Sequence, residues 1–173
     1  MVRDGLRVPR RGDGIPLHEE GEGPVVNLSW RGHEALHRGR IYITHCAAKK
    51  DDSLEGTGRR VTPDLFYAAT PTQRFMRRCR ERGVRWAIFS DHYGVWFSGE
   101  PREWYGDDVG DPDRVTEQRF RELLTNLDEQ LQDFDEIYFY HNPGRFHRLY
   151  KRLLMETALK DRVIMITHLR DIV

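Results

Sequence analysis

The sequence has little cysteine and no long apolar run. No stretch reaches the roughly 20 apolar residues that a membrane-spanning helix needs, and Met1–Gly23 is mostly charged residues, glycine and proline rather than a signal core. We therefore expect no membrane partner. Two cysteines, Cys46 and Cys79, among 173 residues exclude a disulfide scaffold and favour a reducing, cytoplasmic setting.

The chain also has no excess charge of either sign, with 28 basic and 28 acidic side chains. This balance does not indicate a protein that is basic all over, as many nucleic-acid-binding proteins are. Basic residues gather locally in segments 74–85 and 145–152. The length and composition suit one globular domain, which we place at 24–173, after a loosely held arm at 1–23. A short strand at Val25–Trp30 and a helical turn at Arg31–Arg38 are also expected.

Short apolar, β-branched runs predict buried strands at Ile41–Thr44, Val84–Phe89, Ile137–Tyr140 and Val163–Ile166. Helical spacing predicts helices between them, beginning at Thr70, Asp111 and Asn142. For the first helix we expect Thr70 as the cap and Gln73 as its capping-box partner. Strands that alternate with helices predict an α/β fold, with a mainly parallel central sheet of about four to five strands and helices on both faces.

Parallel sheets bind ligands beyond the carboxyl ends of their strands. Each predicted strand leads to a histidine there: His45, His92, His141 and His168. These side chains can form a polar pocket for protons, an anion or a metal, or they can simply meet solvent. No tight ligand pair such as HxH or CxxC occurs, so we predict no cofactor and leave zinc as an open alternative.

Cys46 stands at the end of the first predicted strand, with His45 beside it and Lys49 and Lys50 shortly after. Nearby cations lower the pKa of a thiol and raise its thiolate fraction. A thiolate can attack an electrophilic carbon while a lysine stabilises the developing negative charge. Cys46 can equally be a small buried residue that closes the strand. Cys79, on the apolar side of a predicted helix, is expected in the core.

The same region offers groups that can bind phosphate or a base. Lys49, Lys50, Arg59 and the helix start at Asn142 are candidate phosphate contacts. A solvated loop is the alternative for these charges. Tyr105 and Trp104 can stack on a base or cover the sheet, whereas Trp96 and Phe97 are expected to cover the sheet edge.

Several motifs resemble a domain family of unknown function: Cys46-Ala47-Ala48-Lys49-Lys50, Asp64-Leu65-Phe66-Tyr67, Ser90-Asp91-His92-Tyr93-Gly94 and Glu103-Trp104-Tyr105. The resemblance covers about residues 40–170. That family is similar to the peroxide-stress DNA-binding proteins and, more distantly, to the core domain of archaeosine synthase, which adds an amine to a nitrile on a modified tRNA base. The latter likeness implies Cys46 as nucleophile and Lys50 as its partner. Asp51-Asp52 stands here where the synthase motif has Pro-Tyr.

The leading hypothesis is an enzyme that modifies a nucleobase or nucleotide, a transferase or amidine-forming enzyme. Its candidate catalytic residues are Cys46, Lys50, Ser90, His92 and His141; its candidate binding residues are Lys49, Arg59, Tyr93, Gly94, Tyr105 and Asn142. One alternative is a non-catalytic DNA- or RNA-binding module that uses Lys49, Lys50, Arg77 and Arg78. A further alternative is a nucleotide or metal-dependent hydrolase built on the histidines. The substrate and the oligomeric state stay open.

Overall fold

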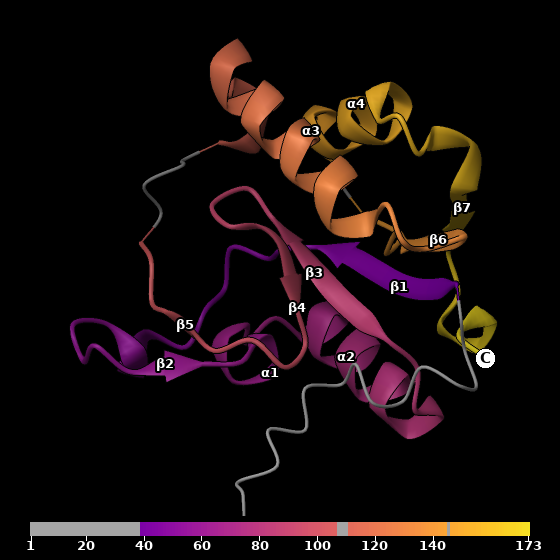
Figure 1. Ribbon diagram of the computed structural model, residues 1–173. Helices are drawn as coiled ribbons and strands as arrows, with labels where there is room; N and C mark the ends of the chain where they lie inside the picture. The colour runs from indigo at the N-terminus through magenta and orange to yellow at the C-terminus, as the bar shows by residue number, and fades with distance from the viewer. Residues whose placement is uncertain (1–38, 107–110, 145) are drawn as a thin grey trace, which may run out of the picture.

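The computed structural model describes residues 39–106, 111–144 and 146–173, which form an α/β fold around a five-stranded sheet (Figure 1). The sheet has the order β4-β3-β1-β6-β7, and its strands are β1 (Arg40–His45), β3 (Trp86–Ser90), β4 (Gly94–Phe97), β6 (Glu136–Tyr140) and β7 (Val163–Ile166). All neighbouring pairs are parallel except β3 and β4, which are antiparallel. The predicted α/β class and mainly parallel sheet are confirmed. The arm at 1–23 and the elements expected at 25–38 lie outside the described residues.

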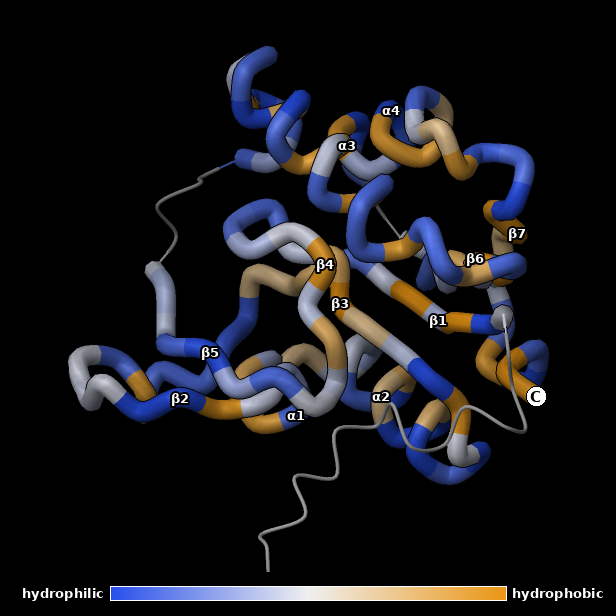
Figure 2. The backbone as a smooth tube through the Cα atoms, in the orientation of Figure 1, coloured by the Kyte–Doolittle hydropathy of each residue, from blue (hydrophilic) through white to orange (hydrophobic). Residues whose placement is uncertain are grey.

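Alternate residues of the central strands enter two separate groups of buried apolar side chains. Ile41 and Ile43 of β1 belong to a first core cluster together with residues of α3 (Glu117–Leu131) and α4 (Arg148–Glu156). Tyr42 belongs to a second core cluster together with residues of α1 (Pro63–Phe66) and α2 (Thr70–Arg82). Figure 2 shows the apolar stretches of β1 and β3 at the centre of the fold. The continuous apolar sequence of β1 therefore reflects burial of its side chains in both clusters.

The first long helix, α2, begins and ends where the sequence predicts, but its start is built differently. Ala69 is the N-cap, with no side-chain capping bond, and Thr70 is already helical. The Gln73 amide does not cap the helix; it donates to the carbonyl oxygens of Asp64 at 2.7 Å and Tyr67 at 2.6 Å. The predicted capping box is wrong because Gln73 braces the preceding turn instead. Gly83 ends the helix with φ 63, as expected for a left-handed C-cap.

The two later helices begin further along the chain than predicted. Asp111-Pro112 opens only a 3-10 turn, Pro112–Arg114, and α3 starts after Thr116, whose hydroxyl accepts a hydrogen bond from the Arg119 N–H at 3.1 Å. Likewise α4 starts after His147 rather than at Asn142-Pro143. Proline suits the start of a tight turn as well as the start of a helix. The motifs Asp111-Pro112 and Asn142-Pro143 therefore could not show whether a turn or a helix begins there.

The sequence analysis expected Trp96 and Phe97 to cover the edge of the sheet. In the structure they belong to β4, the strand that itself forms this edge. The turn into β4 depends on Gly94, which has φ 74 and pairs with Ser90 of β3. Asn126 of α3 packs against this glycine, and its side-chain oxygen accepts a hydrogen bond from the Val95 N–H at 2.8 Å. A two-stranded antiparallel pair, β2 (Arg60–Val61) and β5 (Arg102–Glu103), lies outside the main sheet. Among the described residues, no helix is long and apolar enough to cross a membrane.

We predict that Gly94→Ala destabilises the fold more than Gly56→Ala. Both glycines have positive φ, 74 and 66, so both substitutions force a left-handed backbone on alanine at a cost of about 1–2 kcal/mol. A Cβ at residue 94 would also meet the Asn126 side chain, whereas a Cβ at residue 56 meets nothing within 4 Å. Urea denaturation should give Gly94→Ala a free energy of unfolding lower by at least about 1 kcal/mol than Gly56→Ala. Equal losses would contradict this account of the turn.

Candidate functional site

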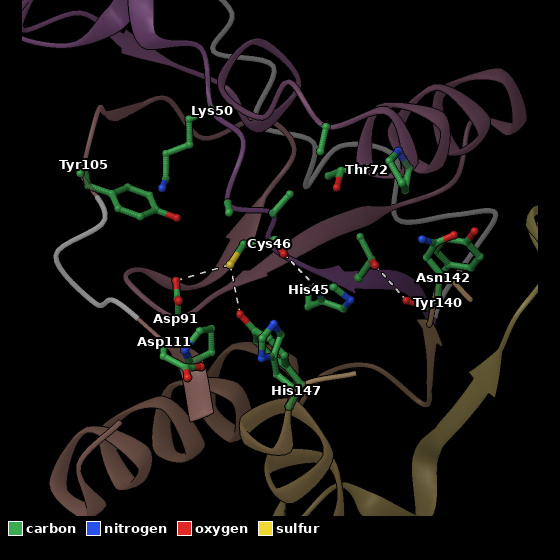
Figure 3. A pocket seen from close by; sticks show the side chains of 18 residues that line it. His45, Cys46, Lys50, Thr72, Asp91, Tyr105, Asp111, Tyr140, Asn142 and His147 are labelled. Carbon is green, nitrogen blue, oxygen red and sulfur yellow. Dashed lines mark hydrogen bonds between the residues drawn. The ribbon is translucent and has the colours of Figure 1, made fainter. Parts of the chain in front are cut away.

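A cavity of about 410 Å³ opens beyond the carboxyl end of β1. That volume lies within the range of about 300–1,000 Å³ usual for small-molecule sites. Figure 3 shows the side chains around it. Its lining includes Thr44, His45, Cys46, Lys50, Thr72, Asp91, Tyr105, Asp111, Tyr140, Asn142, His147 and Tyr150. The cavity lies where the sequence predicts a site, at the end of β1 around Cys46 and Lys50.

Cys46 follows β1 directly and continues its pairing with β3, because its N–H donates to the Phe89 carbonyl at 2.8 Å. Its thiol donates to Asp91 Oδ1 at 3.4 Å, and the sulfur lies 3.1 Å from the Tyr150 hydroxyl (Figure 3). Burial, together with the nearby Asp91 charge, raises the pKa of Cys46 to about 12. Of the two possibilities that the sequence left open for Cys46, these contacts do not favour a cation-stabilised thiolate; they favour a neutral thiol with a carboxylate as its acceptor.

Asp91 is held through its backbone as well as its side chain. The Arg119 guanidinium of α3 donates to the Asp91 carbonyl at 3.1 Å and also to the His92 carbonyl. Asp91 itself is 8% exposed. This arrangement fixes the loop after β3, so the carboxylate stays within reach of the Cys46 proton.

The two adjacent lysines have different surroundings. Lys50 is buried, lines the cavity and places its Nζ 4.8 Å from the centre of the Tyr105 ring. Lys49 is exposed and does not line the cavity. Residue 50 forms an isolated β-bridge with Tyr67, and the Ala68 N–H donates to the Lys49 carbonyl at 3.0 Å. In such extended backbone successive side chains point in opposite directions, which is why Lys50 alone reaches the site.

Ser90 and Tyr105 belong to a buried hydroxyl network at one wall of the cavity. Ser90 Oγ accepts hydrogen bonds from the His92 and Tyr93 N–H groups, each at 3.1 Å, and lies 3.1 Å from the Tyr105 hydroxyl. The Tyr105 hydroxyl also lies 2.8 Å from that of Tyr67, and burial raises the pKa of Tyr105. Ser90 is thus a bracing residue without access to the cavity, whereas Tyr105 lines it, as predicted.

The predicted histidine rim does not form one pocket. Of the four strand-end histidines only His45 lines the cavity. His92 instead stacks against Tyr105, with ring centres 4.2 Å apart, and His141 packs against Phe146 at 4.4 Å; neither lines the cavity. His168 is exposed. His92 and His141 are therefore not placed to act on a molecule in this cavity without rearrangement.

His45, and not the predicted catalytic residues His92 and His141, is the strand-end histidine that lines the cavity. Its Nδ1 lies 2.8 Å from the Cys46 carbonyl oxygen and its ring stacks on Tyr150 at 5.1 Å. Burial lowers the pKa of His45, so the ring is neutral at pH 7. With Nδ1–H donated to the carbonyl, Nε2 remains as a hydrogen-bond acceptor.

Of the remaining predicted binding residues, one lines the cavity and the others do not. Asn142 lines the cavity. Arg59 is exposed, in the chain before β2, and Gly94 serves the β4 turn. Tyr93 donates its hydroxyl to the Glu103 carbonyl at 3.0 Å and does not line the cavity.

The lining residues that the sequence analysis did not predict as site residues include Thr72, Asp91, His147 and Tyr150. Asp91 had a usable signal, since a carboxylate directly after a buried strand points to the site edge. Tyr150 gave the signal of a core residue, because helical spacing places it with Leu149 and Leu153. His147 gave none, because the start of α4 was misplaced. Thr72 gave none, because it stood within the predicted first turn of α2 with no sign that its hydroxyl faces a cavity.

Asp111, Asp113 and His147 are the one group in the described part of the chain with metal-ligand geometry; their ligand atoms lie within 4.8 Å of one another. Local hydrogen bonds already use one oxygen of each carboxylate, and His147 Nδ1 lies 3.5 Å from Asp113 Oδ2. Asp113 Oδ1 accepts a hydrogen bond from the Arg148 N–H at 2.6 Å, and Asp111 Oδ1 accepts one from the Asp113 N–H at 3.0 Å. The group therefore braces the start of α4, and we derive no metal chemistry from it.

No family model, no curated protein and no solved structure matches this chain. The resemblance stated from its motifs therefore stays a prediction. The chemistry of the site is argued below from its own residues.

We predict slow, pH-dependent alkylation of Cys46. Because its pKa is raised to about 12, the thiolate fraction and the iodoacetamide reaction rate should rise about tenfold per pH unit between pH 7 and 10 without reaching a plateau. Asp91→Asn removes a negative charge that raises this pKa, so the rate at pH 8 should increase. Mass spectrometry of the Cys46 peptide measures both rates, and the core residue Cys79 provides the internal reference. A plateau below pH 9 would show a stabilised thiolate and contradict the geometry.

Proposed function

We propose that this protein is an enzyme that modifies a nucleobase or nucleotide through a transient covalent bond between Cys46 Sγ and an electrophilic carbon of the substrate. The observation that carries this proposal is the thiol–carboxylate pair in the cavity, with Cys46 Sγ 3.4 Å from Asp91 Oδ1. A thiol beside its own base at a cavity is the arrangement that nucleophilic catalysis needs.

The chemistry balances without a redox partner. Taking a nitrile as the electrophile, the sulfur forms a bond to carbon as one C≡N π bond breaks, which gives a thioimidate. Asp91 accepts the thiol proton and returns it to the nitrogen of the former nitrile, so the one proton that leaves the sulfur is the one that the nitrogen gains. Lys50, buried at the same cavity, stabilises negative charge as it develops on that nitrogen. An amine can then displace the sulfur, which leaves an amidine and a free thiol.

A flat heterocyclic substrate is supported by the aromatic walls. Tyr105 and Tyr150 line the cavity, and the His45 ring is stacked on Tyr150. Neutral His45 offers an acceptor at Nε2 for an N–H of a base. The motif likeness to archaeosine synthase supports the same class, because that enzyme acts on a nitrile-bearing base.

The two alternatives receive less support. In the non-catalytic nucleic-acid-binding module Arg77 and Arg78 would bind phosphate, but Arg78 Nε donates to the Leu169 carbonyl at 3.2 Å and Arg77 lies 3.9 Å from Glu81. The hydrolase alternative needs a shared histidine site, and only His45 and His147 line the cavity. Neither alternative gives a role to the Cys46–Asp91 pair.

Two further inferences concern the arrangement of the helices and the compartment in which the protein works. We infer that helices cover both faces of the sheet, because α3 and α4 supply the first core cluster and α1 and α2 the second. We also expect the protein to work in a reducing compartment such as the cytoplasm, since its site needs a free thiol and both cysteines are free.

The test is adduct formation with a nucleobase nitrile. Wild-type protein incubated with 7-cyano-7-deazaguanine should gain the full mass of the base by intact mass spectrometry, because addition expels no leaving group. Cys46→Ala should give no adduct, and Asp91→Asn should form it more slowly although its thiol alkylates faster. An adduct in Cys46→Ala, or none in the wild type with this nitrile and with a panel of other base-bearing electrophiles, would overturn the proposal.

The two lysines provide a matched pair of variants for the electrostatic role. Lys50→Met should lower the rate of adduct formation by about 10²-fold, the scale seen when one charge-stabilising donor is removed. Lys49→Met should stay within about twofold, because Lys49 is exposed outside the cavity. Stopped reactions analysed by mass spectrometry measure both rates. Equal effects of the two substitutions would remove Lys50 from the mechanism.

A further inference from the structure

We propose that the N-terminus of α2 is a phosphate-binding subsite of the Cys46 cavity, so that the substrate is a phosphorylated nucleotide rather than a free base. This inference rests on the proposed function for the identity of the base and adds the group that anchors it. It starts from α2 (Thr70–Arg82), a helix of 13 residues whose first turn, with Ala69, Pro71 and Thr72, lines the cavity.

Two backbone N–H groups in the first turn of this helix, those of Thr70 and Thr72, are not used within the described part of the protein. The Gln73 N–H is bonded to the Ala69 carbonyl at 2.9 Å, and Pro71 has no N–H. Among the described residues, the N–H groups of Thr70 and Thr72 have no acceptor, and Ala69 provides no side-chain cap. Free N–H groups at a helix start, with the positive end of the helix dipole, bind phosphate oxygens.

Thr72 provides the second, independent observation. It is only 6% exposed, yet its hydroxyl has no hydrogen-bond partner among the described residues. Figure 3 shows this hydroxyl pointing into the cavity toward the region of Cys46. Because Thr72 lines the cavity, a ligand oxygen there can accept a hydrogen bond from this hydroxyl. Serine and threonine hydroxyls beside helix-start N–H groups are common phosphate ligands.

The charges of the cavity are arranged to favour an anion at this end. Asp91 and Asp111 lie on the opposite side of Cys46 from Thr72 and Asn142 (Figure 3). Asn142 can add an amide donor, while Lys50 contributes a positive charge to the cavity as a whole. A nucleotide can thus place its phosphate at the α2 N-terminus while its base reaches Cys46, away from the carboxylates that would repel the phosphate.

The phosphate can belong to a mononucleotide or to the phosphodiester of a polynucleotide. Both present oxygens of the same chemistry to Thr72 and the helix start, so the ligand is defined by the phosphate. The test below uses inorganic phosphate, GMP, guanosine and a short single-stranded RNA as separate probes. GMP binding without RNA binding identifies the mononucleotide, and the reverse identifies the polynucleotide.

The experiment follows amide signals of ¹⁵N-labelled full-length protein by NMR. Inorganic phosphate and GMP should shift the Thr70 and Thr72 amides, guanosine should not, and GMP should bind more tightly than guanosine. Thr72→Val, which keeps the shape but removes the hydroxyl, should weaken phosphate and GMP binding about tenfold or more, and Thr72→Ser should restore it. Thr125→Val, an exposed position on α3, is the matched control and should leave binding unchanged.

Unshifted Thr70 and Thr72 amides, or equal affinities of Thr72→Val and wild type, would overturn the subsite. Running the same titration on Cys46→Ala keeps this test separate from the proposed function. Phosphate binding by Cys46→Ala, together with no nitrile adduct in the wild type, would mean that the subsite exists and the thiol chemistry fails. Suppose instead that the nitrile adduct forms equally well in wild type and Thr72→Val, and that phosphate shifts no amide signal. The thiol chemistry would then stand and the phosphate subsite would be wrong.

Discussion

The position of β1 between two parallel strands determines where every group of the site lies. Thr44 pairs with Ile88 on one side and with Tyr140 on the other, so β1, β3 and β6 end at the same edge of the sheet. Residues that follow these three strands therefore reach the same cavity: Cys46 directly after β1, Asp91 directly after β3 and Asn142 two residues after β6. The hydrogen bond from the Cys46 N–H to the Phe89 carbonyl, 2.8 Å, extends this register by one residue and holds the sulfur beside Asp91.

Burial then decides which kind of nucleophile Cys46 can be. A thiolate next to a carboxylate in a desolvated site is costly, so burial and Asp91 both keep the proton on sulfur. A pair of thiolate and imidazolium would be reactive toward any electrophile or oxidant, whereas a neutral thiol reacts only when a substrate is placed so that Asp91 can take the proton during attack. The Arg119 contacts to the Asp91 and His92 carbonyls support this because they fix the base before a substrate arrives.

The sequence predicted the location of the site because that location follows from patterns that are local. Apolar runs marked β1, β3, β6 and β7, and the rule for parallel sheets placed Cys46, Lys50 and Asn142 at the edge where the cavity lies. Which side chain of a neighbouring pair faces the cavity is set by tertiary pairing and has no local signal. The bridge to Tyr67 selects Lys50 over Lys49, and the turn between β3 and β4 directs Asp91, not His92, toward the sulfur. Tyr150 shows a further limit, since a tyrosine packs like an apolar residue while its hydroxyl still reaches Cys46.

Cys46 also lies where the two core clusters meet, because its side chain packs against residues of both. That position has a chemical consequence. Cys79, the other thiol, is fully buried in the second cluster between α2 and the sheet, and both cysteines are free. A thiol that works by disulfide exchange needs a second thiol that can reach it through solvent or substrate, and a core residue cannot serve as one without unfolding α2 from the sheet. The addition to carbon that we propose, with the proton passed to Asp91, uses only groups that already face the cavity, whereas a disulfide with Cys79 would require α2 to leave the sheet.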